Sequence, residues 1–309
     1  MSKENTAVTK KKIKRCKEDV VFDAACFIIL TLVLFVVAYP LYWVIISSIS
    51  APSAVSSGKV LLHPIGFTLK GYAEVFKNDQ VMRGFLNSLI ITFCGVMVNL
   101  IVTLPTSYAL SRSNFSGKKP ITIFYMITMF FGGGMIPTYL VVKNMQLLNT
   151  IWALVLPGCL SVYNMIVART FFKSNISEEL YEAGEIDGCT QSRFFFQIAL
   201  PLSKAIIAIM VLYYGVGHWN SYFSALLYIS DQDKYPLQLV LRNILITNQT
   251  ALSQTATTAA ARAALQEQQQ LIDVMKYSLI IISSVPVLIM YPLVQKHFVK
   301  GVMIGSVKG

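Results

Sequence analysis

Charged residues are scarce in this 309-residue chain: Asp, Glu, Lys and Arg make up 13% of it, and hydrophobic residues make up 55%. Soluble domains contain about a quarter charged residues. A helix that crosses a bilayer needs about 20 apolar residues, and six segments approach or exceed that length. They span residues 24–46, 86–109, 121–142, 151–172, 200–229 and 277–294. Too little polar sequence remains to cover six buried helices, so we predict an all-α integral membrane protein with six transmembrane helices.

Charges are also missing from the middle of these segments, since Asp23, Lys143 and Lys204 lie at or near segment ends. Ion-coupled carriers usually place ionisable side chains deep within the bilayer. Their absence argues against the main alternative function, an ion-coupled secondary transporter or channel subunit.

Patterns for catalysis and cofactor binding are scarce as well. His63, His218 and His297 are far apart and lack the spacing of metal ligands. No Gly-x-x-x-x-Gly-Lys-Ser/Thr loop is present to bind ATP phosphates. The run Gly132–Gly134 lies in an apolar segment and favours a helix bend or a close backbone approach. We therefore expect no enzyme activity, no metal and no cofactor bound by this chain.

The five cysteines do not suggest disulfide bonds. Their number is odd, and none falls in a predicted external loop. We expect free thiols at all five positions, which are Cys16, Cys26, Cys94, Cys159 and Cys189.

Lys and Arg set the expected orientation. Seven of them lie in the first 19 residues, and cytoplasmic segments carry an excess of positive charge. The N-terminus is therefore placed in the cytoplasm, where we expect it to contact membrane lipid rather than nucleic acid. Six spans return the C-terminus to the same side. The predicted regions are a basic tail (1–19), a first transmembrane helix (20–50), a transmembrane core (82–294) and a cytoplasmic C-terminal tail (295–309).

One predicted cytoplasmic loop, residues 173–198, is acidic although the formal net charge of the chain is +11. It holds Glu178, Glu179, Glu182, Glu185 and Asp187. Ser177 fits a helix N-cap before acids that suit the helix dipole. Ala183 and Gly184 are small enough for another backbone to approach, and Gly188 permits positive φ. We expect two short helices joined at Gly188. Because the inner leaflet is itself negative, the loop is expected to dock a protein rather than lipid.

This loop also carries a resemblance. Glu182-Ala183-Gly184-x-x-Asp187-Gly188, followed ten residues later by Ile-x-Leu-Pro, resembles the EAA motif of ATP-binding-cassette (ABC) importer permeases. Gly184 replaces the usual second Ala, and both residues are small. The resemblance implies that Glu182, Ala183, Gly184, Asp187 and Gly188 couple the chain to an ATPase subunit.

Other segments narrow the family. Residues 130–140, 217–222 and 295–309 resemble carbohydrate-type importer permeases, close to the maltose-permease second subunit and the LplC/YtcP-like proteins of Gram-positive bacteria. The likeness covers the chain from about residue 20 to its end. Residues 250–270, rich in Ala and Gln, depart from it. They are either an extra external helix or a flexible insert.

The resemblance implies the type I ABC importer permease fold in a bacterial cell membrane and the import of a carbohydrate, specifically an oligosaccharide. The implied partners are a second permease subunit in a heterodimer, two ATPase subunits that bind ATP and Mg, and an extracytoplasmic sugar-binding lipoprotein. Lack of internal duplication fits one chain as half of the pathway.

Four residues are candidates for the sugar path: Trp219, Asn220, Tyr222 and His218. Trp219 and Tyr222 would share one face of a continuous helix, and aromatic rings and amides suit sugar rings and hydroxyls. In the alternative interpretation the two aromatic residues form an interfacial belt. Asn220 and His218 would then make hydrogen bonds between helices. The sequence leaves both open.

Overall fold

The computed structural model describes residues 17–251 and 259–305, and all of its regular elements there are helices. Three single helices, α1 (Lys17–Ser48), α4 (Asp79–Ser111) and the Gln269–Pro292 part of α15 (Ala259–Gly305), are long and apolar enough to cross a membrane. The predicted all-α class is confirmed for the described residues. α15 also shows that residues 259–270 belong to the same helix as the last span.

Three of the predicted spans are bent helix pairs rather than continuous helices. The first pair is α5 (Lys118–Phe130) and α6 (Met135–Asn144), which meet at 113°. The second is α7 (Trp152–Val155) with the short 3-10 helix Leu156–Gly158, bent by 54° from α8 (Val162–Asn175). The third joins residues 191–202 to α12 (Lys204–Trp219) at 81°. With each bent pair taken as one span, the described chain has up to six.

Local chemistry explains the first of these bends. Gly134 has φ +88, in the left-handed region that glycine adopts most readily. A Cβ atom on Gly132 or Gly133 would meet nothing within 4 Å. Of the two roles expected for this run, the chain therefore shows the bend and not a close backbone approach.

The predicted fifth span, residues 200–229, was too long. α12 ends at Trp219, and a separate helix, α13 (Phe223–Tyr228), follows. Gly215 lies within α12, where a Cβ atom would stand 2.3 Å from the Met290 Cε of α15. This glycine therefore allows two helices to pack closely.

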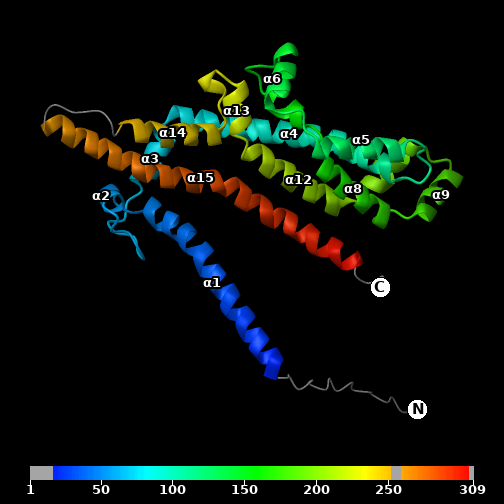
Figure 1. The fold of residues 1–309 in the computed structure, drawn as a ribbon, viewed down its shortest axis with the longest axis horizontal. Coiled ribbons are helices and arrows are strands. Elements are labelled where there is room, and N and C mark those ends of the chain that lie inside the picture. The colour runs from blue at the N-terminus through cyan, green and yellow to red at the C-terminus, as the bar shows by residue number, and fades with distance from the viewer. Residues whose placement is uncertain (1–16, 252–258, 306–309) are drawn as a thin grey trace.

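α4 lies at the centre of the bundle. It packs against α8, α12 and α14 (Leu237–Ala251), while α15 packs against α12, α1, α2 (Pro52–Ser56) and α3 (Lys70–Lys77). Figure 1 shows that α1 joins the other helices only near its C-terminal end. Its most apolar window has no buried residue. A helix that is apolar all round needs lipid or another chain to cover it.

Cys26, Cys94, Cys159 and Cys189 are free thiols, as expected. Cys16 lies outside the described residues, as do the basic tail up to residue 16 and residues 252–258.

Candidate functional site

The acidic loop forms a helix, α9 (Glu178–Ile186), with a defined beginning and end. The Ser177 Oγ accepts a hydrogen bond from the Leu180 N–H at 3.4 Å, which confirms the predicted N-cap. Gly188 has φ +71, as the turn requires. Its N–H donates to the Glu185 carbonyl, and the Cys189 N–H donates to the Gly184 carbonyl at 2.8 Å. These two bonds form a Schellman cap, which fixes the direction in which the chain leaves α9.

A second helical stretch begins at once, as predicted. Thr190 is its N-cap and accepts from the Arg193 N–H at 3.4 Å. The stretch comprises α10 (Gln191–Phe194), a π-helical turn (Phe195–Ala199) and α11 (Leu200–Leu202). It then bends into α12, so the helical stretch that is separated from α9 by four residues leads directly into a membrane helix.

The inner face of α9 packs against α10. The Tyr181 ring meets the Phe194 ring edge to face, with centroids 5.3 Å apart, and both residues are buried. A Cβ atom on Gly184 would lie 3.0 Å from the Phe194 ring. We predicted that Ala183 and Gly184 admit another backbone, but Gly184 makes room for an aromatic side chain of the same loop, and Ala183 is exposed.

Arg112, at the C-terminal end of α4, binds the segment that leads into α9, at Ile176 and Glu178. Its Nη2 donates to the Ile176 carbonyl at 3.2 Å and lies 3.6 Å from Glu178 Oε2. The guanidinium carbon lies 5.5 and 5.3 Å from the ring centroids of Tyr108 and Tyr181, which is close enough for cation–π attraction.

Two further contacts strengthen the attachment to α4. The hydroxyl of Ser113 donates to Glu178 Oε1. The Tyr108 ring contacts the rings of Phe172 in α8 and Phe195 in the π-helical turn, at 5.7 and 5.0 Å. Sequence reasoning missed Arg112 and Tyr108 because no local spacing relates them to a loop more than 60 residues away.

Burial raises the pKa of Tyr181, and a hydrogen bond with Glu185 raises it further. The Tyr181 hydroxyl therefore stays protonated at neutral pH and remains a hydrogen-bond donor. The hydroxyl thus adds no negative charge beside the carboxylate of Glu185.

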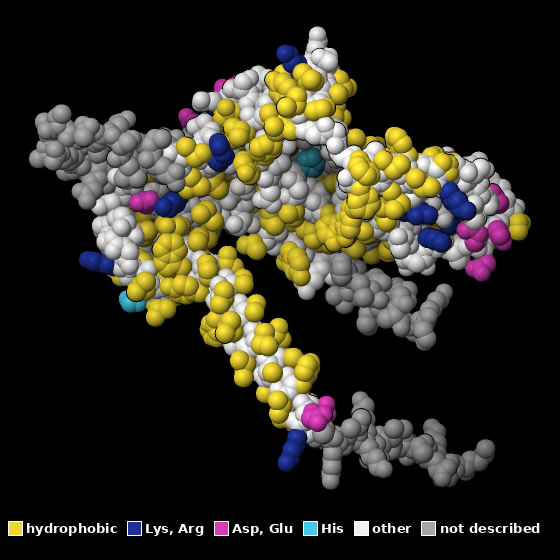
Figure 2. All heavy atoms as spheres, viewed as in Figure 1, with side chains coloured by type: hydrophobic (Ala, Val, Ile, Leu, Met, Phe, Trp, Pro, Cys, Tyr) yellow, Lys and Arg dark blue, Asp and Glu magenta, His cyan; other side chains and the backbone are white. Residues whose placement is uncertain are grey.

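The outer face of α9 combines carboxylates with an apolar tip. Glu182, Ala183 and Asp187 are exposed, and the Ile186 side chain is 86% exposed. Figure 2 shows acidic side chains gathered at this end of the molecule. An exposed Ile within an acidic rim is suited to a partner whose groove is apolar inside and basic at its edge.

The candidate sugar-path residues have different environments. His218 Nε2 lies 2.7 Å from Asn99 Oδ1, and the Asn99 amide donates to the carbonyls of Gly158 and Cys159, at 2.9 Å each. A Cβ atom on Gly95 would come within 2.4 Å of the His218 ring. His218 thus makes the expected hydrogen bond between helices.

Trp219 is buried, with only 2% of its surface exposed. Its Nε1 donates to the Ser283 carbonyl at 2.8 Å, and its ring meets Phe85. Because α12 ends here, Trp219 and Tyr222 do not share a helical face, contrary to our prediction. Tyr222 and Asn220 are exposed, and the Asn220 amide donates to the Val216 carbonyl at 3.0 Å. Asn220 and Tyr222 are thus the exposed candidates in this conformation, while His218 is partly exposed and Trp219 is buried.

Comparison with known proteins gives consistent matches over most of the chain. Residues 94–304 match the family described as binding-protein-dependent transport system inner membrane component. Protein LplC of Bacillus subtilis is 39% identical over 289 residues, which cover 94% of this chain and 95% of LplC. The polygalacturonan/rhamnogalacturonan transport system permease protein YtcP of the same organism is 37% identical, covering 93% of this chain and 98% of YtcP.

A solved structure gives the same fold. It is described as a bacterial ABC transporter involved in the import of the acidic polysaccharide alginate. One of its chains matches with a TM-score of 0.82 and 27% identity, over 93% of this chain and 100% of that chain.

Proposed function

The chain belongs to the family of binding-protein-dependent transport system inner membrane components, and we propose that it forms half of the pathway of an oligosaccharide importer in the bacterial cell membrane. It is an all-helical permease of the type I ABC importer fold and not an enzyme. The observation that carries the proposal is the rigid, capped α9 with its exposed acidic face, at the place where the family couples to its ATPase.

Within this proposal the five motif residues have distinct roles. Glu182 and Asp187 provide the charged outer face. The side chain of Ala183 is small, so a groove of the ATPase could approach α9 closely there. Gly184 accommodates the Phe194 ring, and Gly188 closes the cap. ATP and Mg would be bound by the partner ATPase, and this chain would receive the movement that hydrolysis drives.

The proposed assembly contains a second, different permease subunit, two ATPase subunits and an extracytoplasmic sugar-binding protein. The proposed orientation has both termini in the cytoplasm. In Figure 1 the C-terminal end of α15 points toward the end of the molecule that carries α9, which supports a cytoplasmic C-terminus.

The transported compound is proposed to be an oligosaccharide, with an acidic one as the first to test. One relative is named for polygalacturonan and rhamnogalacturonan, and the structural neighbour for the acidic polysaccharide alginate. Asn220 and Tyr222 are the candidates in this chain that could reach it, because Trp219 is buried against Ser283 and Phe85.

The test is reconstitution of this permease in proteoliposomes with the ATPase, the second permease and the binding protein. We expect ATP-dependent uptake of labelled oligogalacturonides and slower uptake of neutral oligosaccharides of equal length. ADP in place of ATP is the control. A transport-active complex that contains this chain as its only permease would contradict the heterodimer, and uptake of neutral sugars alone would contradict the acidic substrate.

A further inference from the structure

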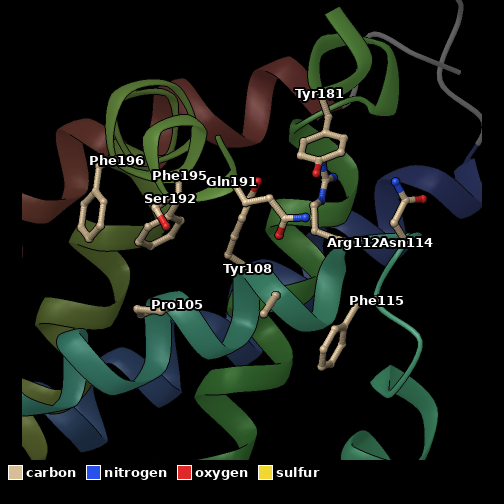
Figure 3. A pocket seen from close by; sticks show the side chains of 11 residues that line it. Pro105, Tyr108, Arg112, Asn114, Phe115, Tyr181, Gln191, Ser192, Phe195 and Phe196 are labelled. Atoms are coloured by element: carbon tan, nitrogen blue, oxygen red, sulfur yellow. The ribbon is translucent and has the colours of Figure 1, made fainter. Parts of the chain in front are cut away.

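A cavity of about 330 Å³ lies beside the acidic loop (residues 173–198), which is called the coupling loop below. The cavity is located where the C-terminal end of α4 meets α9 and α10. Figure 3 shows the side chains of Arg112, Tyr181 and Gln191 turned toward one space from three different elements. Tyr108 also lines this polar end. Some of the hydrogen-bond donors at this end of the cavity take no part in the contacts that attach the coupling loop to α4.

The unused donors belong mainly to Arg112. Its side chain is only 8% exposed. Nη2 is bonded to the Ile176 carbonyl, but Nε and Nη1 are buried without a hydrogen-bond partner, and so is the hydroxyl of Tyr108. Buried donors on a charged group are costly when unpaired. A guanidinium bonds most strongly to carboxylate and phosphate oxygens.

The charge around Arg112 leaves room for an anion. Glu178 is the nearby carboxylate, 3.6 Å from Nη2, and its side chain is 39% exposed, so solvent screens it. A second cation lies on the other side. The Lys118 Nζ donates to the carbonyls of Arg112 and Ser113, at 3.1 and 3.0 Å. Arg112 and Lys118 thus bring two positive charges to the end of α4, where the nearby carboxylates are the partly exposed Glu178 and the Glu185 that contacts Tyr181.

The opposite wall of the cavity is apolar. It is formed by Pro105 and Ala109 of α4 and by Phe195 and Phe196, and the Phe196 side chain is 64% exposed. From Ala109, the exposed apolar residues Pro105 and Ile101 follow along α4 at four-residue steps, each turned about 40° around the helix axis. The buried donors of Arg112 thus lie next to exposed apolar residues of the membrane helix α4.

We propose that this cavity binds the phosphate-containing head group of an anionic phospholipid of the inner leaflet. Arg112 and Tyr108 donate to the phosphate oxygens, and an acyl chain lies along the exposed face of α4. Anionic lipids gather at the cytoplasmic leaflet, and basic pockets between membrane helices bind their head groups. A free phosphate ion would satisfy the same donors but would leave the apolar wall and the exposed apolar residues of α4 uncovered. The inference rests on the proposed cytoplasmic side of the coupling loop and not on the transported sugar.

The test measures phosphatidylglycerol bound to the purified, assembled importer by native mass spectrometry during a lipid titration. Arg112→Gln removes the charged donors, and Lys119→Gln is its control because it removes an exposed positive charge at the same end of the chain. Ala109→Trp fills the apolar wall but leaves Arg112 and its contacts intact. Ile90→Trp is its control, since it adds the same ring to an exposed position near the other end of α4.

We expect both controls and the unaltered importer to retain one tightly bound phosphatidylglycerol per copy of this chain. Arg112→Gln should weaken that binding by about tenfold or more, the loss expected for a charge-assisted hydrogen bond. Ala109→Trp should weaken it to a similar extent, because the ring occupies the space of the lipid. If Arg112→Gln does not assemble, Ala109→Trp alone tests the site.

Three results would overturn the proposal. Equal lipid affinity in all variants would remove the site. Displacement of the lipid by inorganic phosphate, with Ala109→Trp having no effect, would make it a free-anion site. Loss of ATPase binding rather than lipid binding in Arg112→Gln would assign the cavity to an ATPase side chain. An importer that binds the lipid but takes up no oligosaccharide would contradict only the proposed transport function.

Discussion

Gly188→Trp is expected to abolish ATP-driven uptake while the protein still folds and inserts into the membrane. The expected cause is bulk at the turn, which would prevent the two short helices from packing into the ATPase. A Cβ atom at Gly188 would meet nothing within 4 Å, so packing of Tyr181 on Phe194 is undisturbed. The new ring would instead stand at the outer surface beside Ile186, where the ATPase is proposed to dock.

The size of the effect follows from two terms. The backbone of Gly188 has φ +71, and a residue with a Cβ atom in that region costs about 1–2 kcal/mol. A bulky side chain forced into a fitted contact typically costs about 1–3 kcal/mol more. The sum, about 2–5 kcal/mol, weakens docking by about 30-fold to several thousand-fold. The first term acts locally at the cap, so the amount of protein in the membrane should change little.

Gly188→Asn separates these two terms. Asn adopts the left-handed conformation with little strain and can end a helix in this way, and it adds little bulk. We expect it to retain most of the uptake. The assays are the amount of chain in membranes, co-purification of the ATPase, ATPase stimulation by loaded binding protein, and uptake in proteoliposomes. Normal uptake with Gly188→Trp would refute the coupling role, and an equal loss with Gly188→Asn would place the defect in the helix cap.

Four further substitutions test other parts of the structure. Ile186→Asp should leave thermal stability within about 0.5 kcal/mol of the original but reduce ATPase co-purification at least tenfold; unchanged co-purification would remove Ile186 from the docking face. Asn99→Ala should lower stability by about 1–3 kcal/mol in thermal unfolding, because His218 loses its partner; an unchanged melting temperature would contradict this. Trp219→Ala should cost about 3–5 kcal/mol and reduce the folded yield, whereas Asn220→Ala should raise the KM for oligosaccharide at normal yield. An unchanged KM would assign the sugar contacts to the other permease.

Several features were predictable because they depend on composition or on a few adjacent residues. The apolar segments are helical, Ser177 caps α9, and Gly188 has positive φ. Each follows from a local rule: hydrophobic length, a hydroxyl before an acidic turn, and a residue without a Cβ atom. The Ile-Ala-Leu-Pro stretch that ends with Pro201 was likewise placed correctly at the entry to a membrane segment.

Other features could not be predicted because hydropathy reports an average over about 20 residues. Such an average does not reveal where the backbone hydrogen bonds of a segment stop, so the 54° bend between α7 and α8 was missed. Trp219 shows a second limit. An indole ring is common both at membrane interfaces and in sugar-binding sites, so the residue type alone does not place Trp219. Its position is fixed by a hydrogen bond to the Ser283 carbonyl, 64 positions away, in the protein interior. Arg112 is the attachment point of the loop, but the Ile176 carbonyl that it contacts is 64 positions away, so no local pattern marks it.

The contacts of α9 also explain how a loop outside the membrane could move helices within it. Glu178, at its start, is held by Arg112 and Ser113 at the end of α4, and Tyr181 is packed on Phe194 of α10. The turn between α9 and α10 is capped by two backbone hydrogen bonds. A displacement of α9 is therefore transmitted directly to α4 and α10, because no flexible segment separates them.

The first interruption of regular helix beyond that point is Ser203, between α11 and α12, where the chain bends by 81°. Ser203 is fully buried, and its hydroxyl has no hydrogen-bond partner. The backbone N–H and carbonyl of Ser203 are both hydrogen-bonded, to Leu200 and Ile207, but a helix that is already bent can change its angle at lower cost than an unbroken one. We infer that movement of α9 is converted there into a changed tilt of α12, the helix that carries His218 and leads to Asn220.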